Sequence, residues 1–334
     1  MTIKKKIAIV TGGGGFIGSH MVDLLLSKKY RVIVIDNFSG GHKRNLYHHR
    51  KNPLLKVVKM DICKIKSNSK IFKNVDYVFH FAGIGDVVPS IENPSKYMMT
   101  NIQGTIKILE ASVYGKIKKF VYAASASCYG ISKKIVNEKH KISLEHPYAL
   151  SKYLGEQSAF HWSKVYGLPV NAIRIFNAYG TRVRTTGAYG AVIGVFFKQK
   201  IENKPLTIVG NGKQSRDFVY VTDVARAFYA AAQTKISGRV YNVGTGNPKS
   251  VNFLANLVGG KKVFIPNRPG EPFTSRADIR KIKKELNWKP TINFKEGISI
   301  MIKEIYKWKD APLWTPKKIK SSTKNWFKYL SKKD

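Results

Sequence analysis

Two side chains four positions apart in the chain offer acid–base chemistry. Tyr148 and Lys152 stand at the start of a segment with helical patterning, so they are predicted to share one face of a helix. On such a face an ammonium group lowers the pKa of a phenol from its ordinary value of about 10. A tyrosine in this setting would act as a general base.

Spacing alone does not select this pair, because the lysine-rich chain contains five Tyr-x-x-x-Lys pairs. They are Tyr47/Lys51, Tyr114/Lys118, Tyr129/Lys133, Tyr148/Lys152 and Tyr329/Lys333. Context favours Tyr148, because Pro147 opens its helix after a predicted strand that carries Ser125 at its C-terminal end. Ligands bind at that end of the strands in open α/β sheets. Ser125 is therefore expected to form a hydrogen bond beside Tyr148.

A glycine cluster predicts a dinucleotide site near the N-terminus. Gly12, Gly15 and Gly18 fall where the first predicted strand turns into a helix. They would permit a tight turn, backbone approach to a pyrophosphate and close helix packing, in that order. Asp36 ends the second predicted strand, 18 positions after Gly18, where a carboxylate accepts hydrogen bonds from ribose hydroxyls and repels a 2′-phosphate. NAD is therefore expected rather than NADP.

Elements that position these residues alternate along the first half of the chain, a pattern typical of parallel strands joined by helical crossovers. Strands are predicted at Lys6 to Val10, Arg31 to Ile35, Lys56 to Lys59, Tyr77 to Phe81, Phe120 to Ala124 and Val170 to Ile175. Helices are predicted at Ile17 to Ser27, Ser95 to Ser112 and Tyr148 to Tyr166. The fold class expected is α/β with a doubly wound parallel sheet.

After about Asn177 the pattern changes to glycine-rich loops and shorter segments, which indicates a smaller α/β substrate-binding domain. We expect a cofactor-binding domain at residues 1–176, completed by about 214–244, and a substrate domain at 177–213 and 245–310. The helix expected after Ser250 should be short, ending at Gly259. A basic aromatic tail follows at residues 311–334, in which we expect a helix that docks aromatic side chains.

Composition excludes several classes of protein. With 334 residues, 43% hydrophobic, the chain is expected to fold as a globular protein. It has no recognisable secretion signal and no apolar run of roughly 18 residues, so a cytoplasmic protein is expected. Cys63 and Cys128 are too few and too far apart to predict a disulfide framework or a metal site.

The formal net charge is +39, which raises the alternative of a nucleic-acid-binding protein or of contacts with anionic lipid. Because lysines are scattered over every predicted surface segment and no recognised nucleic-acid module accompanies them, a solvated basic surface is favoured.

Successive motifs give the chain a family resemblance. Those in the first half are Thr11 to His20, Asp36-Asn37, Asp61, Phe81-Ala82-Gly83, Asn101, Ser125 to Gly130 and Tyr148 to Lys152. Those in the second half are Arg174 to Gly180, Gly210 to Tyr220, Tyr241 to Gly244 and Arg268 to Pro272. Together they resemble extended short-chain dehydrogenase/reductases, in the nucleotide-sugar epimerase and dehydratase branch, which have a Rossmann sheet.

The resemblance implies roles for individual residues. Ser125, Tyr148 and Lys152 would be catalytic. The cofactor would contact Gly12, Gly15, Phe16, Ile17, Gly18, Asp36, Asn37, Asp61, Ile62, Phe81, Ala82, Gly83, Asn101, Tyr148 and Lys152. The sugar nucleotide would contact Ser127, Asn177, Arg216, Arg268, Glu271 and Ser275, with arginines suited to its diphosphate.

The reaction that the resemblance favours is epimerisation at C4 through a 4-keto intermediate. Dehydratases of this branch carry acidic residues just after the serine or threonine, where this chain has Ala126 and Ser127. In related epimerases a bulky residue at the position of Ser275 excludes N-acetyl groups, so UDP-hexoses and UDP-N-acetylhexosamines are both expected substrates. The family also implies a homodimer that pairs the helices predicted at Ser95 to Ser112 and Tyr148 to Tyr166.

Alternatives remain open. Another epimerase or a reductase of the same branch could act on a different nucleotide or carbon, and a reductase would consume added NAD(P)H. Outside the enzymes, the alternatives are a nucleotide-sensing or nucleic-acid-binding protein.

Overall fold

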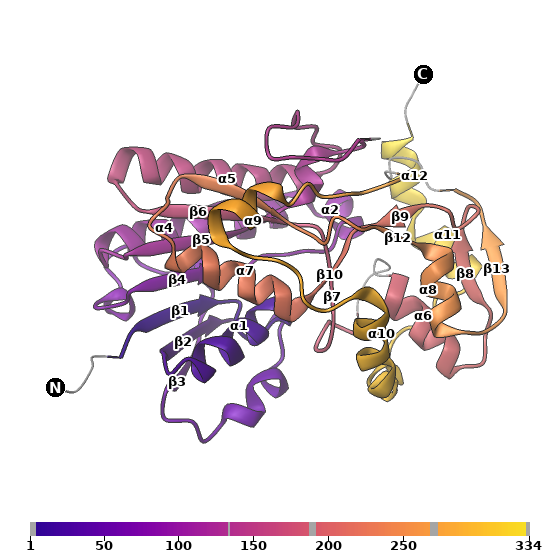
Figure 1. Cartoon of the computed structure of the whole chain (residues 1–334), viewed down its shortest axis with the longest axis horizontal. Coiled ribbons are helices and arrows are strands. Elements are labelled where there is room, and N and C mark those ends of the chain that lie inside the picture. The colour runs from indigo at the N-terminus through magenta and orange to yellow at the C-terminus, as the bar shows by residue number, and fades with distance from the viewer. Residues whose placement is uncertain (1–4, 133, 187–191, 268–272, 332–334) are drawn as a thin grey trace.

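A seven-stranded parallel sheet forms the centre of the molecule (Figure 1). We describe it from a computed structural model, at residues 5–132, 134–186, 192–267 and 273–331. The strand order is β11-β6-β5-β4-β1-β2-β3. The strands are β1 (Ile7–Thr11), β2 (Arg31–Asp36), β3 (Leu55–Lys59), β4 (Tyr77–His80), β5 (Lys119–Ser125), β6 (Val170–Ile175) and β11 (Arg239–Val243). The predicted strands are confirmed to within a residue at either end.

Helices cover both faces of this sheet, as its parallel strands require. Helices α1 (Phe16–Ser27) and α7 (Val221–Gln233) pack together on one face. Helices α4 (Gly104–Tyr114) and α5 (Pro147–Tyr166) pack on the other (Figure 1). The doubly wound α/β fold predicted from the sequence is confirmed.

The helix predicted at Ser95 to Ser112 is interrupted. It consists of α3 (Pro94–Met98), a π-helical turn (Met99–Gln103) and α4. The π turn contains Asn101, which is buried and bonds to the loop after β4. A π turn adds one residue to the helical repeat, a feature that often marks a functional site and that sequence periodicity does not reveal.

A second, smaller core lies beside one end of the main sheet (Figure 1). Its elements are α6 (Val192–Ile201), β8 (Leu206–Val209), α8 (Val251–Val258), β13 (Lys262–Ile265) and α10 (Phe294–Lys303). Helix α8 is short and stops before Gly259, as predicted. Two further small sheets join β7 (Asn177–Tyr179) to β10 (Phe218–Tyr220) and β9 (Ser215–Arg216) to β12 (Lys249–Ser250). The domain limits given above stay a prediction.

The C-terminal tail forms two short helices, α11 (Pro316–Ser322) and α12 (Lys324–Leu330). Only part of the aromatic docking expected there is present. Trp326 is buried, whereas Phe327 and Tyr329 are exposed, because they lie on the solvent-facing side of α12.

Helix α9 (Arg280–Leu286) packs near β11, and α2 (Val88–Glu92) contacts α12. Within the described residues we find no helix with the length and apolar content to cross a membrane.

Candidate active site

The glycine cluster forms a tight turn between β1 and α1. Gly12 has a φ of +68°, and a Cβ there would lie 2.7 Å from the backbone nitrogen of Ala82. A Cβ on Gly18 would lie 2.2 Å from the carbonyl oxygen of Gly12. Gly15 precedes the first residues of α1, Phe16 and Ile17, and no side chain caps that helix. Free N–H groups at a helix N-terminus bind phosphate, so the turn fits a dinucleotide pyrophosphate.

Asp36 lies beside this turn at the end of β2. Its carboxylate accepts hydrogen bonds from the backbone nitrogens of Gly14 (2.8 Å) and Phe38 (2.7 Å). Burial raises the pKa of Asp36, and these two bonds oppose that shift. Each carboxylate oxygen has a second lone pair, so the group retains acceptors for ribose hydroxyls.

Asp61 and Asn37 extend the site along the edge of the sheet. Asn37 donates to the Asp61 carboxylate (2.9 Å), and the Cys63 backbone nitrogen donates to it as well. The bond from Cys63 is the main reason why the pKa of Asp61 is lowered.

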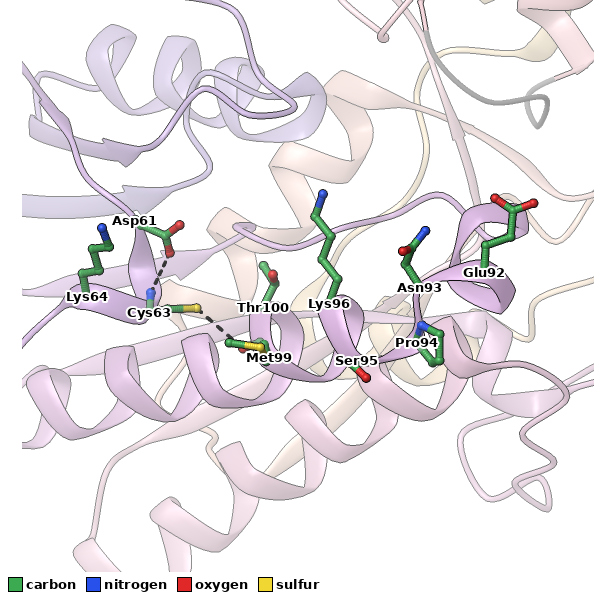
Figure 2. Close-up of a pocket in the computed structure, with 10 residues that line it drawn as sticks. All are labelled: Asp61, Cys63, Lys64, Glu92, Asn93, Pro94, Ser95, Lys96, Met99 and Thr100. Atoms are coloured by element: carbon green, nitrogen blue, oxygen red, sulfur yellow. Dashed lines mark hydrogen bonds between the residues drawn. The ribbon is translucent and has the colours of Figure 1, made fainter.

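Asp61 also borders a cavity of about 610 Å³. Figure 2 shows Asp61 and Lys64 at one end of this cavity and Glu92 and Asn93 at the other. Ile62, predicted to contact adenine, is buried beneath this surface. The cavity is a pocket of suitable size for the adenosine half of a dinucleotide.

The segment after β4 approaches the same edge of the sheet. Phe81 and Ala82 follow the strand, and the Ala82 nitrogen donates to the Thr11 hydroxyl. A Cβ on Gly83 would lie 2.8 Å from the Asn101 side-chain oxygen. Asn101 also donates to the Ser151 hydroxyl (2.9 Å), so its amide joins this loop to α5.

Tyr148 is the member of the five Tyr-x-x-x-Lys pairs that faces Ser125. Ser125, which ends β5, lies close enough to Tyr148 for its side chain to lower the pKa of the tyrosine. Tyr47, Tyr114 and Tyr329 are each more than half exposed. Tyr129 is buried, and its partner Lys133 lies outside the described residues.

The expected effect of Lys152 on the tyrosine is wrong for this structure. Burial raises the pKa of Tyr148 above its ordinary value, although the neighbouring Ser125 side chain opposes the shift. Burial also lowers the pKa of Lys152 to about 7, so a large part of the lysine is neutral near pH 7. The Lys152 ammonium lies 4.5 Å from the centroid of the Tyr122 ring. A neutral lysine does little to lower the pKa of a nearby phenol. Burial disfavours the charged form of each group, the ammonium of Lys152 and the phenolate of Tyr148.

Of the residues predicted to contact the sugar nucleotide, three converge from distant parts of the chain. Asn177 begins β7 and Arg216 ends β9. The Ser275 nitrogen donates to the Ser215 carbonyl oxygen (3.1 Å), which places Ser275 beside Arg216. Ser127 is half-buried next to Ser125, and its nitrogen donates to the Ser125 hydroxyl. Arg268 and Glu271 lie outside the described residues.

Sequence analysis missed Asp217, on which this side of the site depends. Asp217 is fully buried. One carboxylate oxygen accepts from the Thr245 nitrogen and hydroxyl, and the other from the nitrogens of Gly246 and Ala277. A single carboxylate thus joins three loops around Arg216. Its position directly after a candidate phosphate-binding arginine was the available signal.

Two further acidic residues were also missed. Glu156 lies one helical turn after Lys152 and forms a two-point ion pair with Arg174 (2.6 and 2.9 Å). Its charge raises the pKa of Lys152, against the larger effect of burial. Asp86 forms an ion pair with Arg184, and its charge raises the pKa of Tyr148. The helical spacing could have revealed Glu156, but no local pattern marks Asp86.

A histidine cluster lies on the outer side of α1. His48 and His49 each place Nε2 within 2.9 Å of the same oxygen of Asp23, an arrangement of atoms that could hold a metal ion. The Arg182 guanidinium contacts the other oxygen of this carboxylate. Because that cation already compensates the negative charge, we interpret the cluster as a link between α1 and the loop after β7.

Comparison with known proteins identifies the family. Residues 8–244 match the model of the NAD dependent epimerase/dehydratase family. The chain belongs to this family. NAD is accordingly the cofactor, and the glycine turn with Asp36 has the geometry to hold it.

Relatives in the family carry out more than one reaction. A putative UDP-glucose 4-epimerase of Methanocaldococcus jannaschii is 39% identical over 88% of this chain and 96% of its own. A UDP-N-acetyl-alpha-D-glucosaminuronate decarboxylase of Bacillus cytotoxicus is 30% identical over 91% of this chain and 98% of its own. The structure of a UDP-N-acetylglucosamine 4-epimerase from Methanobrevibacter ruminantium superimposes with a TM-score of 0.84 at 32% identity. That comparison covers 90% of this chain and all of the other.

Proposed function

We propose that this protein interconverts the C4 epimers of a UDP-linked sugar, UDP-glucose or UDP-N-acetylglucosamine. The observation that carries the proposal is the closeness of Ser125 to Tyr148 at the carboxyl edge of the sheet. Lys152 lies one helical turn from Tyr148, and the glycine turn lies at the same edge. Two of the named relatives are 4-epimerases.

In this proposal Tyr148 exchanges a proton with the C4 hydroxyl of the sugar. NAD, when bound, would supply the hydride acceptor and donor for that carbon. The Ser125 side chain beside Tyr148 lowers the pKa of the tyrosine, which opposes the effect of burial. If a positively charged group were bound beside Tyr148, it would stabilise the tyrosinate and lower the pKa of Tyr148 further.

Dehydration is disfavoured by the residues beside Ser125. Elimination of water from a 4-keto sugar needs a further acid and base. Ala126 and Ser127 occupy the short helix after β5, and neither carries a carboxylate. The keto sugar is therefore expected to turn within the pocket and be reduced again. Arg216, whose position the loops around Asp217 fix, would hold the diphosphate of the keto sugar while the sugar rotates.

Decarboxylation of a UDP-uronic acid is a second candidate, because one named relative is a decarboxylase. It shares oxidation at C4 as its first step. A uronic carboxylate would gain from a free cation near Tyr148, but among the described residues the Arg184 guanidinium is already paired with Asp86 there, and Lys152 has a pKa lowered to about 7. This favours an uncharged sugar.

The small side chain of Ser275 supports a pocket that admits N-acetylhexosamines as well as hexoses. The half-buried Ser275 lies beside Arg216 through its bond to Ser215. Conversion of UDP-glucose together with no conversion of UDP-N-acetylglucosamine would contradict this part of the proposal.

The test is incubation of the purified protein, without added cofactor, with UDP-, dTDP-, GDP- and CDP-linked sugars. NMR would follow the configuration at C4. Conversion of a UDP-hexose supports epimerisation, and release of carbon dioxide from a UDP-uronic acid supports decarboxylation instead. Turnover only with added NAD(P)H would identify a reductase and overturn the proposal.

We also propose a homodimer formed through α4 and α5. Exposed apolar side chains on these helices support it, namely Tyr114, Leu154, Val165 and Tyr166. Light scattering after size exclusion would measure the mass in solution, and a species of 37.7 kDa would contradict the proposal.

A further inference from the structure

The C-terminal helix α12 lies against the active site, far from its place in the sequence. It packs on α2, and the Asn325 amide lies 3.4 Å from the Glu92 carboxylate, to which it donates. Figure 1 shows α12 beside α2 at the upper edge of the molecule. Trp326 is 5% exposed and is the buried aromatic residue of this helix.

Trp326 reaches Tyr148 through His146. The centroids of the Trp326 and His146 rings are 6.1 Å apart. The His146 ring stacks on Tyr148, with 5.9 Å between centroids and an interplanar angle of 10°. Contacts between aromatic rings at these distances restrict how each ring can move.

His146 also caps the helix that carries Tyr148. Its Nδ1 accepts a hydrogen bond from the Ala149 nitrogen (3.1 Å), so the ring proton lies on Nε2. Burial lowers the pKa of His146 to about 4, which keeps the ring neutral near pH 7. A neutral Nδ1 is required for this cap, because a protonated imidazole has no acceptor.

Tyr148 needs such support because it is the second residue of α5. The first turn of a helix has no internal partner for its N–H groups and is the part that frays. On the other side of the tyrosine, the Tyr97 ring approaches edge-on at 6.5 Å. The Tyr97 hydroxyl donates to the Asp86 carbonyl oxygen (2.5 Å), just before α2. Helix α12 therefore contacts both structures that flank Tyr148, the His146 cap and the α2 segment.

We propose that α12 is a built-in wall of the active site, and that Trp326 and His146 are positioning residues for Tyr148. Neither of them touches the reacting atoms. The inference rests on the proposed role of Tyr148 as the acid–base group. In functional terms, the basic C-terminal tail contributes to catalysis through packing, and its lysines between Lys317 and Lys328 face solvent.

The test compares four single variants and the double variant Trp326→Ala/His146→Asn in the full chain. Trp326→Ala removes the wall, and Trp326→Phe keeps a ring there. His146→Asn retains a good helix cap but loses the stacked ring. Tyr329→Ala is the matched control, because this residue is exposed on the same helix.

Two measurements are made on each variant. The first is kcat and KM for C4 epimerisation. The second is the pH titration of Tyr148 by NMR of protein labelled with ¹³C at tyrosine Cζ, with the resonance assigned from Tyr148→Phe. The titration does not depend on turnover, so it tests the positioning role even if the substrate assignment fails.

We expect Trp326→Ala and His146→Asn to lower kcat by roughly two- to tenfold, with little change in KM, since aromatic pairs contribute about that much. Both should shift the Tyr148 titration. Trp326→Phe and Tyr329→Ala should behave like the unmodified protein. Because Trp326 acts through His146, the double variant should be no worse than His146→Asn alone.

Unchanged kcat and an unchanged titration in His146→Asn would overturn the inference, as would additive effects in the double variant. If Trp326→Ala does not fold, His146→Asn and Trp326→Phe decide the question. An equal loss in Tyr329→Ala would show that any change in α12 has the same effect, and would also contradict it.

Discussion

The two sides of the candidate site are built differently. On the cofactor side, Asp36 ends a strand of the parallel sheet, and Gly12 and Gly83 lie in the turns after two other strands, where close backbone packing fixes their positions. On the sugar side, Asn177 and Arg216 lie on strands of three and two residues. A buried carboxylate, Asp217, holds the loops around them.

This contrast has a physical meaning. A change of backbone in the sheet disturbs many main-chain hydrogen bonds at once. The cofactor side therefore tolerates little variation in its backbone. The sugar side depends on a few bonds to one side chain, and loops of this kind vary more readily between relatives. Relatives with one cofactor and different reactions agree with such an arrangement.

Tyr148 stands between the two sides, and its removal should have the largest effect. Tyr148→Phe should lower kcat by about 10²–10⁴-fold, the usual contribution of a general acid or base. The amount of NAD bound should not change. Tyr114→Phe, from an exposed Tyr-x-x-x-Lys pair, is the control for both measurements. Unimpaired turnover in Tyr148→Phe would falsify the mechanism.

Gly12→Ala should damage the cofactor side alone. The residue combines a positive φ with a Cβ position 2.7 Å from the Ala82 nitrogen, so we expect a loss of about 3–4 kcal/mol in unfolding free energy. NAD affinity should fall as well. Gly238 also has a positive φ, +72°, but open space around it, so Gly238→Ala should cost only about 1–2 kcal/mol. Chemical denaturation and NAD titration measure both, and equal losses in the two variants would show that crowding is irrelevant.

Asp217→Asn should damage the sugar side alone. An amide nitrogen cannot accept the bonds that a carboxylate oxygen accepts, so in either orientation of the amide at least one backbone donor would be left without a partner. We expect a loss of about 2–4 kcal/mol in unfolding free energy. KM for the nucleotide sugar should rise about tenfold, while NAD affinity stays unchanged. Asp310→Asn, at an exposed position, is the control. A fall in NAD affinity equal to the rise in KM would contradict the separation of the two sides.

The smallest effect expected concerns acid stability on the cofactor side. His80 is fully buried between the hydroxyls of Thr11 and Thr105, and burial lowers its pKa to about 3. Below pH 6.5 the unfolded chain binds a proton at this histidine and the folded protein does not, so stability falls as the pH falls. By pH 5 this histidine alone should cost about 2 kcal/mol.

Denaturation at pH 5 and at pH 7 measures this difference. His80→Gln should reduce the loss between the two pH values by about that amount. His161→Gln, at an exposed histidine, should leave it unchanged. The difference between pH values is the relevant quantity, because the substitution also alters packing at both. An identical loss in all three proteins would rule out His80 as its source.

Much of the cofactor side could be predicted from the sequence, because residues such as Gly12, Gly18 and Asp36 lie at or shortly after the ends of strands whose patterns are local. Gly18 and Asp36 needed only their distance from a predicted strand. The sugar side could not be predicted in this way. One backbone hydrogen bond joins Ser275 to Ser215, 60 positions earlier in the chain, and no periodic pattern predicts it.

Electrostatics also escaped prediction. The spacing of Tyr148 and Lys152 suggested a lowered pKa for the tyrosine, but spacing carries no information about burial. In the folded protein, burial determines the direction of the shift for both groups. The contact between Trp326 and His146 joins residues 180 positions apart, so no local sequence pattern could predict it.

The π turn at Met99–Gln103 has a consequence for how the gene can change. Each α-helical residue advances by about 100°, so deleting one residue here would convert the turn to ordinary helix and rotate everything before it by that angle. Tyr97 would then turn away from Asp86, while α4 kept its place on the sheet. Point substitutions can be absorbed at many positions of this helix. Its length is constrained more tightly, because a single deleted codon would separate Tyr148 from the Tyr97 ring beside it.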